Sequence, residues 1–375
     1  MIPDDSRFER DPDELLASEP PLPDGWSVTG VDPSVDADVD RLVELLRGHE
    51  VAGRGWAGAG RDGVLVEISD LGTRTRANAV VRDPDGVVQG WGSVHDRAAG
   101  RMLLLHVVAR DLDHVVAARC ARVLLTWAEA QAREVGAARG LPVQQIDTGA
   151  FTDDPRQHAW LSAAGFERVR TWWQMSRPVT EAEAGLVPDP ERWEKDGVVF
   201  RAVGREGSGM PDEADLRKVH HVLEGAFTDH FNSREETFAE FVHRLRQDPG
   251  HRWDHWWLAE IVDGDEAEPA GALVATESES DDGPHGSYVD YLGVLANARG
   301  RGVAKGLLHT VIADAALRGR NRVGLEVDAD SPTGADGLYT SMGWTSSYLT
   351  QSWHKDVPVT DDAAGSPADD AADPA

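Results

Sequence analysis

The sequence predicts an α/β (α+β) protein built from two copies of one fold. Two series of elements follow the same order, in which several strands precede a long helix, a strand, a short helix and a closing strand. The ends of the two series also match, because Ala159–Phe166 resembles Leu338–Trp344 and each is followed by an aromatic-rich strand ending in Pro-Val. Repetition of a whole set of elements indicates a tandem duplication.

Length and composition set the broad class. The 375 residues exceed one typical domain, and 41% hydrophobic residues with 13 Trp predict packed cores. The formal net charge is −29, from 66 acidic and 37 basic residues. This charge opposes nucleic acid and anionic membrane surfaces as partners and favours cationic partners, including amines.

Composition shifts predict the domain boundaries. The first residues and the last are rich in Pro and acidic residues, which is typical of disordered segments. No basic-then-apolar signal pattern opens the chain, and its apolar runs are too short for a membrane span, so we expect a soluble cytoplasmic protein. The expected units are a flexible leader (1–23), a first domain (24–178), a linker (179–197), a second domain (198–358) and a disordered acidic tail (359–375).

In the first domain, Leu42, Leu45 and Leu46 share one face of an expected helix, and Asp83-Pro-Asp-Gly predicts a turn between two strands. Apolar periodicity predicts the other elements. The expected helices are Val39–His49, Val115–Val135 and Pro155–Ala164; the expected strands are Val64–Ile68, Asn78–Arg82, Val87–Val94, Met102–Ala109, Pro142–Ile146 and Arg168–Ser176.

The second domain repeats this order. An acidic turn separates two of its expected strands, and a final aromatic strand closes it. The expected helices are Glu213–Phe227, Arg234–Arg246, Val303–Arg318 and Thr333–Met342; the expected strands are Val198–Val203, Trp256–Val262, Gly271–Thr276, Tyr288–Leu295, Arg322–Val327 and Ser347–His354.

The most informative stretch is the strand Tyr288–Leu295 with the basic turn and helix that follow it. Gly300 and Gly302 let the backbone turn tightly, and the helix near Val303 presents unpaired N–H groups and a positive dipole end. Such a turn can hold a phosphate, although an ordinary strand-turn-helix is the alternative. Neither a Walker pattern nor a dinucleotide-binding pattern fits the spacing of the glycines.

The turn reads Arg299-x-x-Gly302-x-Ala304, which resembles the pyrophosphate loop of the Gcn5-related N-acetyltransferase (GNAT) superfamily. A second family motif follows about 35 residues later as Ala335-Asp-Gly-Leu-Tyr339-Thr-Ser-Met-Gly-Trp344. The resemblance covers roughly Val198 to Asp356. It implies two tandem GNAT (acyl-CoA N-acyltransferase) folds, each a central mixed, mostly antiparallel sheet flanked by helices.

The resemblance also implies an acetyl-CoA site in the second domain. In the family, the end of this strand pairs through its backbone with the pantetheine arm, and the loop wraps the pyrophosphate. The pantetheine positions here are Leu292, Gly293 and Val294, and the loop positions are Arg299, Gly300, Arg301, Gly302, Val303 and Ala304. The implied reaction is transfer of an acetyl group from acetyl-CoA to a primary amine, which we expect to be small and basic.

The acid and base candidates follow from motif positions and from chemistry. Tyr339 is the candidate acid for the CoA thiolate, with packing under the cofactor as its alternative role. An amine of lysine type must lose a proton before it attacks. Several family members carry a glutamate where Tyr288 stands, and a tyrosine cannot be a base at neutral pH. Asp290 on the same strand face, Glu326 on the next strand, and a relayed water remain as candidates.

The first copy lacks these features. Leu161 stands in the place of Tyr339, and Val116–Ala121 lies opposite Arg299–Ala304 without the glycines. We expect this copy to be structural, covering the second domain in place of a dimer partner and forming one wall of the substrate site, with a residual cofactor or effector role as the alternative. Among tandem members, mycothiol synthase has a similar architecture with an active second copy, but Tyr288 in place of a glutamate makes mycothiol synthesis a minority option.

For the remaining polar and reactive residues, the sequence favours structural roles. The histidines show no metal-binding spacing, so we expect no metal. We assign Cys120 and the Trp253, Trp256 and Trp257 group to packing. The expected partners are a small-molecule amine and acetyl-CoA, with no nucleic acid and no membrane, in a monomer or homodimer. The competing function is a non-catalytic acyl-CoA-binding regulator.

Overall fold

The computed structural model describes residues 22–69, 75–97, 100–186, 197–205, 207, 209–227, 237–239, 241–242, 253–264, 266–278, 285–329 and 335–359. Nearly all of the expected leader and tail, and most of the expected helix Arg234–Arg246, lie outside these ranges.

Twelve strands of the described residues form one sheet, in the order β1-β2-β3-β4-β5-β12-β6-β11-β10-β9-β8-β7. Neighbouring strands are antiparallel except in the β4–β5 and β10–β11 pairs. The bounds are β1 (Ser27–Thr29), β2 (Arg76–Arg82), β3 (Val88–Arg97), β4 (Arg101–Val108), β5 (Val143–Phe151), β6 (Glu167–Pro178), β7 (Val198–Ala202), β8 (Trp256–Asp263), β9 (Glu266–Ser278), β10 (Gly286–Val294), β11 (Arg322–Asp328) and β12 (Thr345–Pro358).

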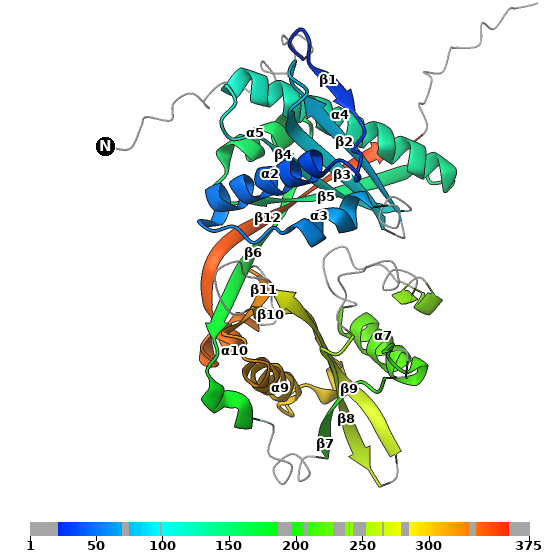
Figure 1. Cartoon of the computed structure of the whole chain (residues 1–375). Coiled ribbons are helices and arrows are strands. Elements are labelled where there is room, and N and C mark those ends of the chain that lie inside the picture. The colour runs from blue at the N-terminus through cyan, green and yellow to red at the C-terminus, as the bar shows by residue number, and fades with distance from the viewer. Residues whose placement is uncertain are drawn as a thin grey trace, which may run out of the picture.

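Helices cover both faces of this sheet (Figure 1). The helices of the described residues are α2 (Asp36–Arg54), α3 (Arg61–Ile68), α4 (His114–Ala138), α5 (Pro155–Ala163), α7 (Glu213–Phe227), α9 (Val303–Leu317) and α10 (Ala335–Ser341), with the short turns η3 (Glu181–Gly185) and η4 (Ala296–Ala298). The predicted fold class is therefore confirmed. None of these helices combines the length and hydrophobicity that a bilayer span requires.

One expected element has the wrong type. Residues Val64–Ile68 belong to the helix α3 and not to a strand. A short apolar run fits either period, and here the helical one prevails because Val64 and Ile68, four residues apart, are both buried against Val39 and Leu42 of α2.

We call residues 24–178 the first half and residues 198–358 the second half. The last strand of each half pairs with strands of the other half. β6 pairs with β11, and β12 pairs with β5 on one side and with β6 on the other. In Figure 1 the red-orange β12 runs from the second half into the first, while the green β6 runs the opposite way. Trp353 of β12 is buried in the core with Leu125 of α4, and Met175 of β6 is buried with Leu308 of α9. Each half therefore completes the core of the other.

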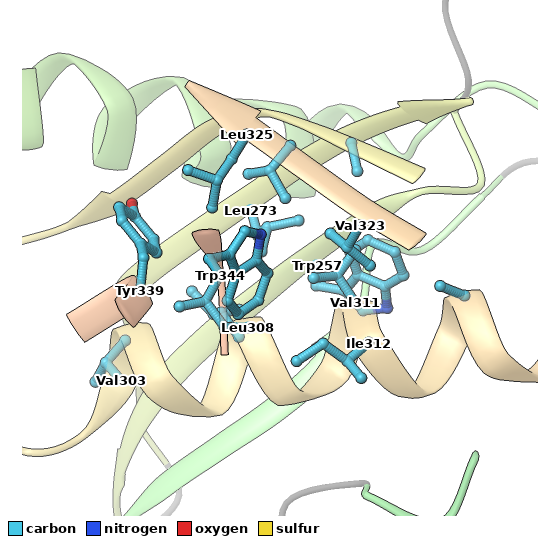
Figure 2. Packing of buried hydrophobic residues seen from close by; sticks show 14 of the residues in the cluster. Trp257, Leu273, Val303, Leu308, Val311, Ile312, Val323, Leu325, Tyr339 and Trp344 are labelled. Atoms are coloured by element: carbon cyan, nitrogen blue, oxygen red, sulfur yellow. The ribbon is translucent and has the colours of Figure 1, made fainter. Parts of the chain in front are cut away.

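The core of the second half lies between α9 and the strands (Figure 2). One side of α9 contributes Leu308, Val311 and Ile312, which pack on Leu273 and on the strand β11. Alternate residues of β11, Val323 and Leu325, point to this core. Gly324 and Glu326, which alternate with them along β11, therefore face the opposite side of the sheet, where the polar site described below lies.

The strand exchange predicts that a residue near the C-terminal end stabilises the first half. Trp353→Ala removes a side chain that is 7% exposed, and we expect it to lower the free energy of unfolding by about 3–5 kcal/mol. Leu349→Ala on the same strand, where the side chain is 37% exposed, is the control and should cost far less. Urea denaturation measures both; equal effects would contradict the structure.

Candidate active site

A fork opens in the sheet between β10 and β11. The two strands pair only from Ser287–Val323 to Val289–Leu325. Beyond that point β10 remains paired with β9 as far as Val294, and β11 remains paired with β6 as far as Asp328. The pairing with β9 shifts register between Val289 and Tyr291, which marks a bulge that bends the strand. We call the region beyond Val289 and Leu325 the C-terminal fork.

The C-terminal fork leaves one backbone edge of β10 without a described strand beside it. The expected pantetheine residues Leu292, Gly293 and Val294 are the last three residues of this edge. Gly293 allows α7 to pack closely, because a Cβ there would lie 3.0 Å from Cβ of Ala226. An extended amide-bearing chain could add to this edge as a further strand does.

The helix α9 begins beside this edge with an uncapped N-terminus. Gly302 is its N-cap, with a left-handed φ of 78° and no side-chain cap, and Gly300 has a φ of 79°. The first turn of α9 carries no acidic residue, while the exposed Arg299 and Arg301 flank it. Free N–H groups, the positive dipole end and two guanidinium groups together suit a diphosphate.

Tyr339 lies in the core cluster beside α9. Its side chain is 9% exposed and its ring meets that of Trp344, with 6.1 Å between the ring centroids. Its hydroxyl points away from α9 (Figure 2). Burial raises the pKa of Tyr339 to about 12, so the hydroxyl carries its proton at neutral pH. Tyr339 shares the cluster with Leu325, the last residue of β11 to pair with β10.

The two candidate bases lie where the C-terminal fork begins. Asp290 and Glu326 are the first residues of β10 and β11 after the last paired residues, Val289 and Leu325. Asp290 is exposed at the bulge. Although part of Glu326 is also exposed, its carboxylate accepts a hydrogen bond from Nε2 of Gln174. Partial burial raises the pKa of Glu326 above its usual value, whereas the hydrogen bond from Gln174 lowers it.

Gln174 links Glu326 to its neighbours. The Tyr288 hydroxyl donates to Oε1 of Gln174 (3.2 Å), and Nε2 of Gln174 also donates to Oγ1 of Thr350 (3.1 Å). Because Tyr288 occupies the amide oxygen, the amide nitrogen of Gln174 faces Glu326. Gly324 makes this possible, because a Cβ there would lie 3.0 Å from the Tyr288 ring.

Tyr288 is neutral in this site. Burial, and to a smaller extent the negative charge of Glu326, raises the pKa of Tyr288 well above its usual range. This agrees with the sequence argument that Tyr288 is not a base. Sequence reasoning missed Gln174, because β6 was expected to belong to the first half; the one signal was a lone amide within the apolar run Trp172–Met175.

The first half contains a similar fork that its own side chains fill. β4 and β5 pair in parallel only as far as Leu104–Thr148. Beyond that point Arg156 donates to the carbonyl oxygens of Val108 (2.9 Å) and Ala109 (3.3 Å). We call this region the N-terminal fork. Its free backbone acceptors are therefore used by the guanidinium of Arg156.

The helix that follows the N-terminal fork is capped by an acid. The carboxylate of Asp113 accepts from the N–H groups of Val115 (2.9 Å) and Val116 (3.4 Å) at the start of α4. A phosphate at this helix end would meet a negative charge instead of free donors. Leu161, at the place of Tyr339, is fully buried.

The remaining sequence predictions concern packing. Cys120 is fully buried, and burial raises the pKa of its thiol to about 12. Trp256 and Trp257 are buried in the cores of the second half. Both predictions of a packing role are confirmed. Within the described ranges, no group of three or more His, Cys, Asp or Glu side chains is placed to hold a metal ion.

Comparisons with known proteins agree with this geometry. Residues 217–344 match the family model described as "Acetyltransferase (GNAT) family". A sequence search of curated proteins gives no match. Among solved structures, a GCN5-related N-acetyltransferase from Sphaerobacter thermophilus is similar with a TM-score of 0.67 and 22% identity, over 90% of this chain and 97% of that one.

Two further solved structures share the architecture. A tandem GNAT protein from the clavulanic acid biosynthesis pathway has a TM-score of 0.61 and 15% identity, over 90% of this chain and 100% of that one. N-myristoyltransferase from Saccharomyces cerevisiae with bound myristoyl-CoA has a TM-score of 0.53 and 9% identity, over 92% and 82%. At these identities the likeness shows the fold alone. The family match identifies residues 217–344 as a GNAT acetyltransferase domain, and the solved structures show a similar fold over 90% of the chain.

Proposed function

We propose that the second half, residues 198–358, is an N-acetyltransferase that moves an acetyl group from acetyl-CoA to a primary amine of a small basic molecule. The observation that carries this proposal is the C-terminal fork, where an open strand edge, two carboxylates and an uncapped helix N-terminus converge. The same fork in the first half is occupied by Arg156 and Asp113, which supports one acetyl-CoA per chain.

Acetyl-CoA would lie along the open edge of β10. Its pantetheine amides bond to the backbone of Leu292, Gly293 and Val294, and its pyrophosphate lies on the loop formed by residues 299–304. The thioester then points to the closed end of the fork. There Val289, Leu325 and Tyr339 are buried in one cluster, which favours a short acyl group.

The reaction is direct transfer. The protonated amine binds near Asp290 and loses its proton to Glu326, directly or through a water molecule. Its nitrogen then attacks the thioester carbonyl carbon, so that a C–N bond forms and the C–S bond breaks. Tyr339 donates its proton to the departing thiolate, and the attacking nitrogen loses its second proton to the resulting phenolate, directly or through a water molecule, which leaves the amide, the CoA thiol and a neutral Tyr339. Glu326 is favoured over Asp290 as the base because its pKa is raised towards neutral pH.

The phosphate seat can be tested by Gly302→Asp. Acetyl-CoA should raise the melting temperature of the unsubstituted protein, and the substitution should abolish the shift because it places a carboxylate on the pyrophosphate path. Gly319→Asp is the control, because Gly319 has the same left-handed conformation (φ 69°) but lies at the other end of α9 with free space around it. If no CoA ester raised the melting temperature of the parent protein, the proposal would be wrong.

The base assignment can be tested by Glu326→Gln and Asp290→Asn. Free-thiol release across an amine panel gives the activity, and Glu326→Gln should lower kcat/KM by about 10²–10⁴-fold, with a smaller effect of Asp290→Asn mainly on KM. Release of free thiol would also exclude the competing function, a non-catalytic acyl-CoA-binding regulator. If Asp290→Asn were the more damaging change to kcat, the two roles would be reversed.

The same variants predict a pH dependence. The protonated amine is the form that binds and Glu326 must be ionised to accept its proton, so kcat/KM should fall as the pH drops through the raised pKa of Glu326. Glu326→Gln should remove this fall. A profile of unchanged steepness would argue against Glu326.

The acid can be tested by Tyr339→Phe, which keeps the ring and removes the proton donor. We expect kcat to drop by about 10²-fold or more while acetyl-CoA still raises the melting temperature. Full activity of Tyr339→Phe at all pH values would leave Tyr339 only its packing role against Trp344.

A further inference from the structure

An exposed tryptophan and a half-buried tyrosine form a pair at the junction of the two halves. Trp56, just after α2, and Tyr348, on β12, meet edge to face with 5.4 Å between ring centroids and 79° between planes. The Trp56 side chain is 47% exposed. We call these two rings the aromatic corner.

The aromatic corner is held rigidly. The Arg54 guanidinium lies 5.4 Å from the Trp56 ring centroid and 5.7 Å from that of Tyr348. It also donates to the Trp56 carbonyl oxygen (3.2 Å) and to the Tyr348 hydroxyl (3.3 Å). The Phe151 ring also packs against Tyr348, with 5.8 Å between centroids.

The backbone around Trp56 is fixed as well. Gly55 ends α2 in a left-handed conformation. The Glu50 carboxylate pairs with Arg54 (2.8 Å) and accepts from the N–H groups of Gly58 (2.6 Å) and Ala59 (2.8 Å). Because Arg54 is neutralised by Glu50, it holds the rings in place and does not offer a free positive charge. A large exposed ring is thus presented at a fixed angle.

The sheet register places the aromatic corner on the same face as the base. Tyr348 is opposite Gln174 on β6, and Gln174 is opposite Glu326 on β11. Residues directly opposite one another point to the same face. Because neighbouring strands are about 4.8 Å apart, the backbone positions of Tyr348 and Glu326 are separated by about 10 Å. An extended ligand on this face could contact both positions.

The C-terminal fork and the aromatic corner would present different chemistry to the two ends of such a ligand. At the fork the ligand meets the carboxylates of Asp290 and Glu326, which favour a cationic amine. At the other end it meets the exposed face of Trp56, which favours a planar apolar group. We propose that the aromatic corner binds an aromatic ring of the amine acceptor, so that the substrate class is arylalkylamines with about 10 Å between amine and ring. This inference rests on the proposed function.

Binding measured without turnover tests the inference. Phenylhexylamine and, as the same apolar chain without a ring, hexylamine are titrated calorimetrically into CoA-saturated protein. We expect phenylhexylamine to bind about tenfold more tightly than hexylamine, and Trp56→Ala to remove that advantage. Trp56→Phe should keep most of it. Val51→Ala is the control, because Val51 is 50% exposed on the same helix and lies outside the aromatic corner.

Turnover separates this inference from the proposed function. Acetylation of phenethylamine, phenylbutylamine and phenylhexylamine should depend on linker length in the parent protein and lose that dependence in Trp56→Ala. Equal binding of both amines, or an unchanged preference in Trp56→Ala, overturns the inference even if the amines are acetylated. A ring preference that Trp56→Ala abolishes supports the inference even if no amine is acetylated, in which case the proposed function fails alone.

Discussion

The exchange of β6 and β12 is the constraint on which the rest of the structure depends. β6 of the first half pairs with β11 and β12 of the second, and β12 pairs with β5 and β6 of the first, so twelve strands form one sheet. Separating the halves would expose long strand edges and the buried rings that cross the boundary, such as Trp353. The exchange also brings Gln174 from the first half beside Glu326 of the second. Stability and the candidate site therefore rely on the same pairing.

The two forks show how one backbone geometry can be kept with and without a ligand site. In both halves a parallel pair diverges after a few residues, which leaves backbone groups without a strand partner. Buried backbone groups need partners. The N-terminal fork supplies them internally through Arg156 and Asp113, whereas the C-terminal fork has an uncapped helix at Gly302. Only the second leaves its donors for an anionic cofactor.

At the C-terminal fork, the two faces of the sheet differ in their electrostatic environment. On the α9 side, Tyr339 is buried among apolar side chains and stays protonated. On the opposite face Glu326 is a carboxylate with a raised pKa, bonded to the neutral amide of Gln174 and not to a described cation. A proton donor and a proton acceptor on either side of one opening suit transfer of a group between them.

The sequence by itself determined the fold class, nearly all described elements and the residues at the C-terminal fork, because periodicity and glycine-bearing turns are local signals. Strand alternation also predicted which face Glu326 occupies, whereas the bulge at Asp290 interrupts the alternation from which its face was predicted. The sequence could not decide that Val64–Ile68 is helical, because burial against α2 settled that. Gln174, Trp56 and Tyr348 were missed for a related reason. Their role depends on which strands pair across the halves, and only the tertiary structure decided that pairing.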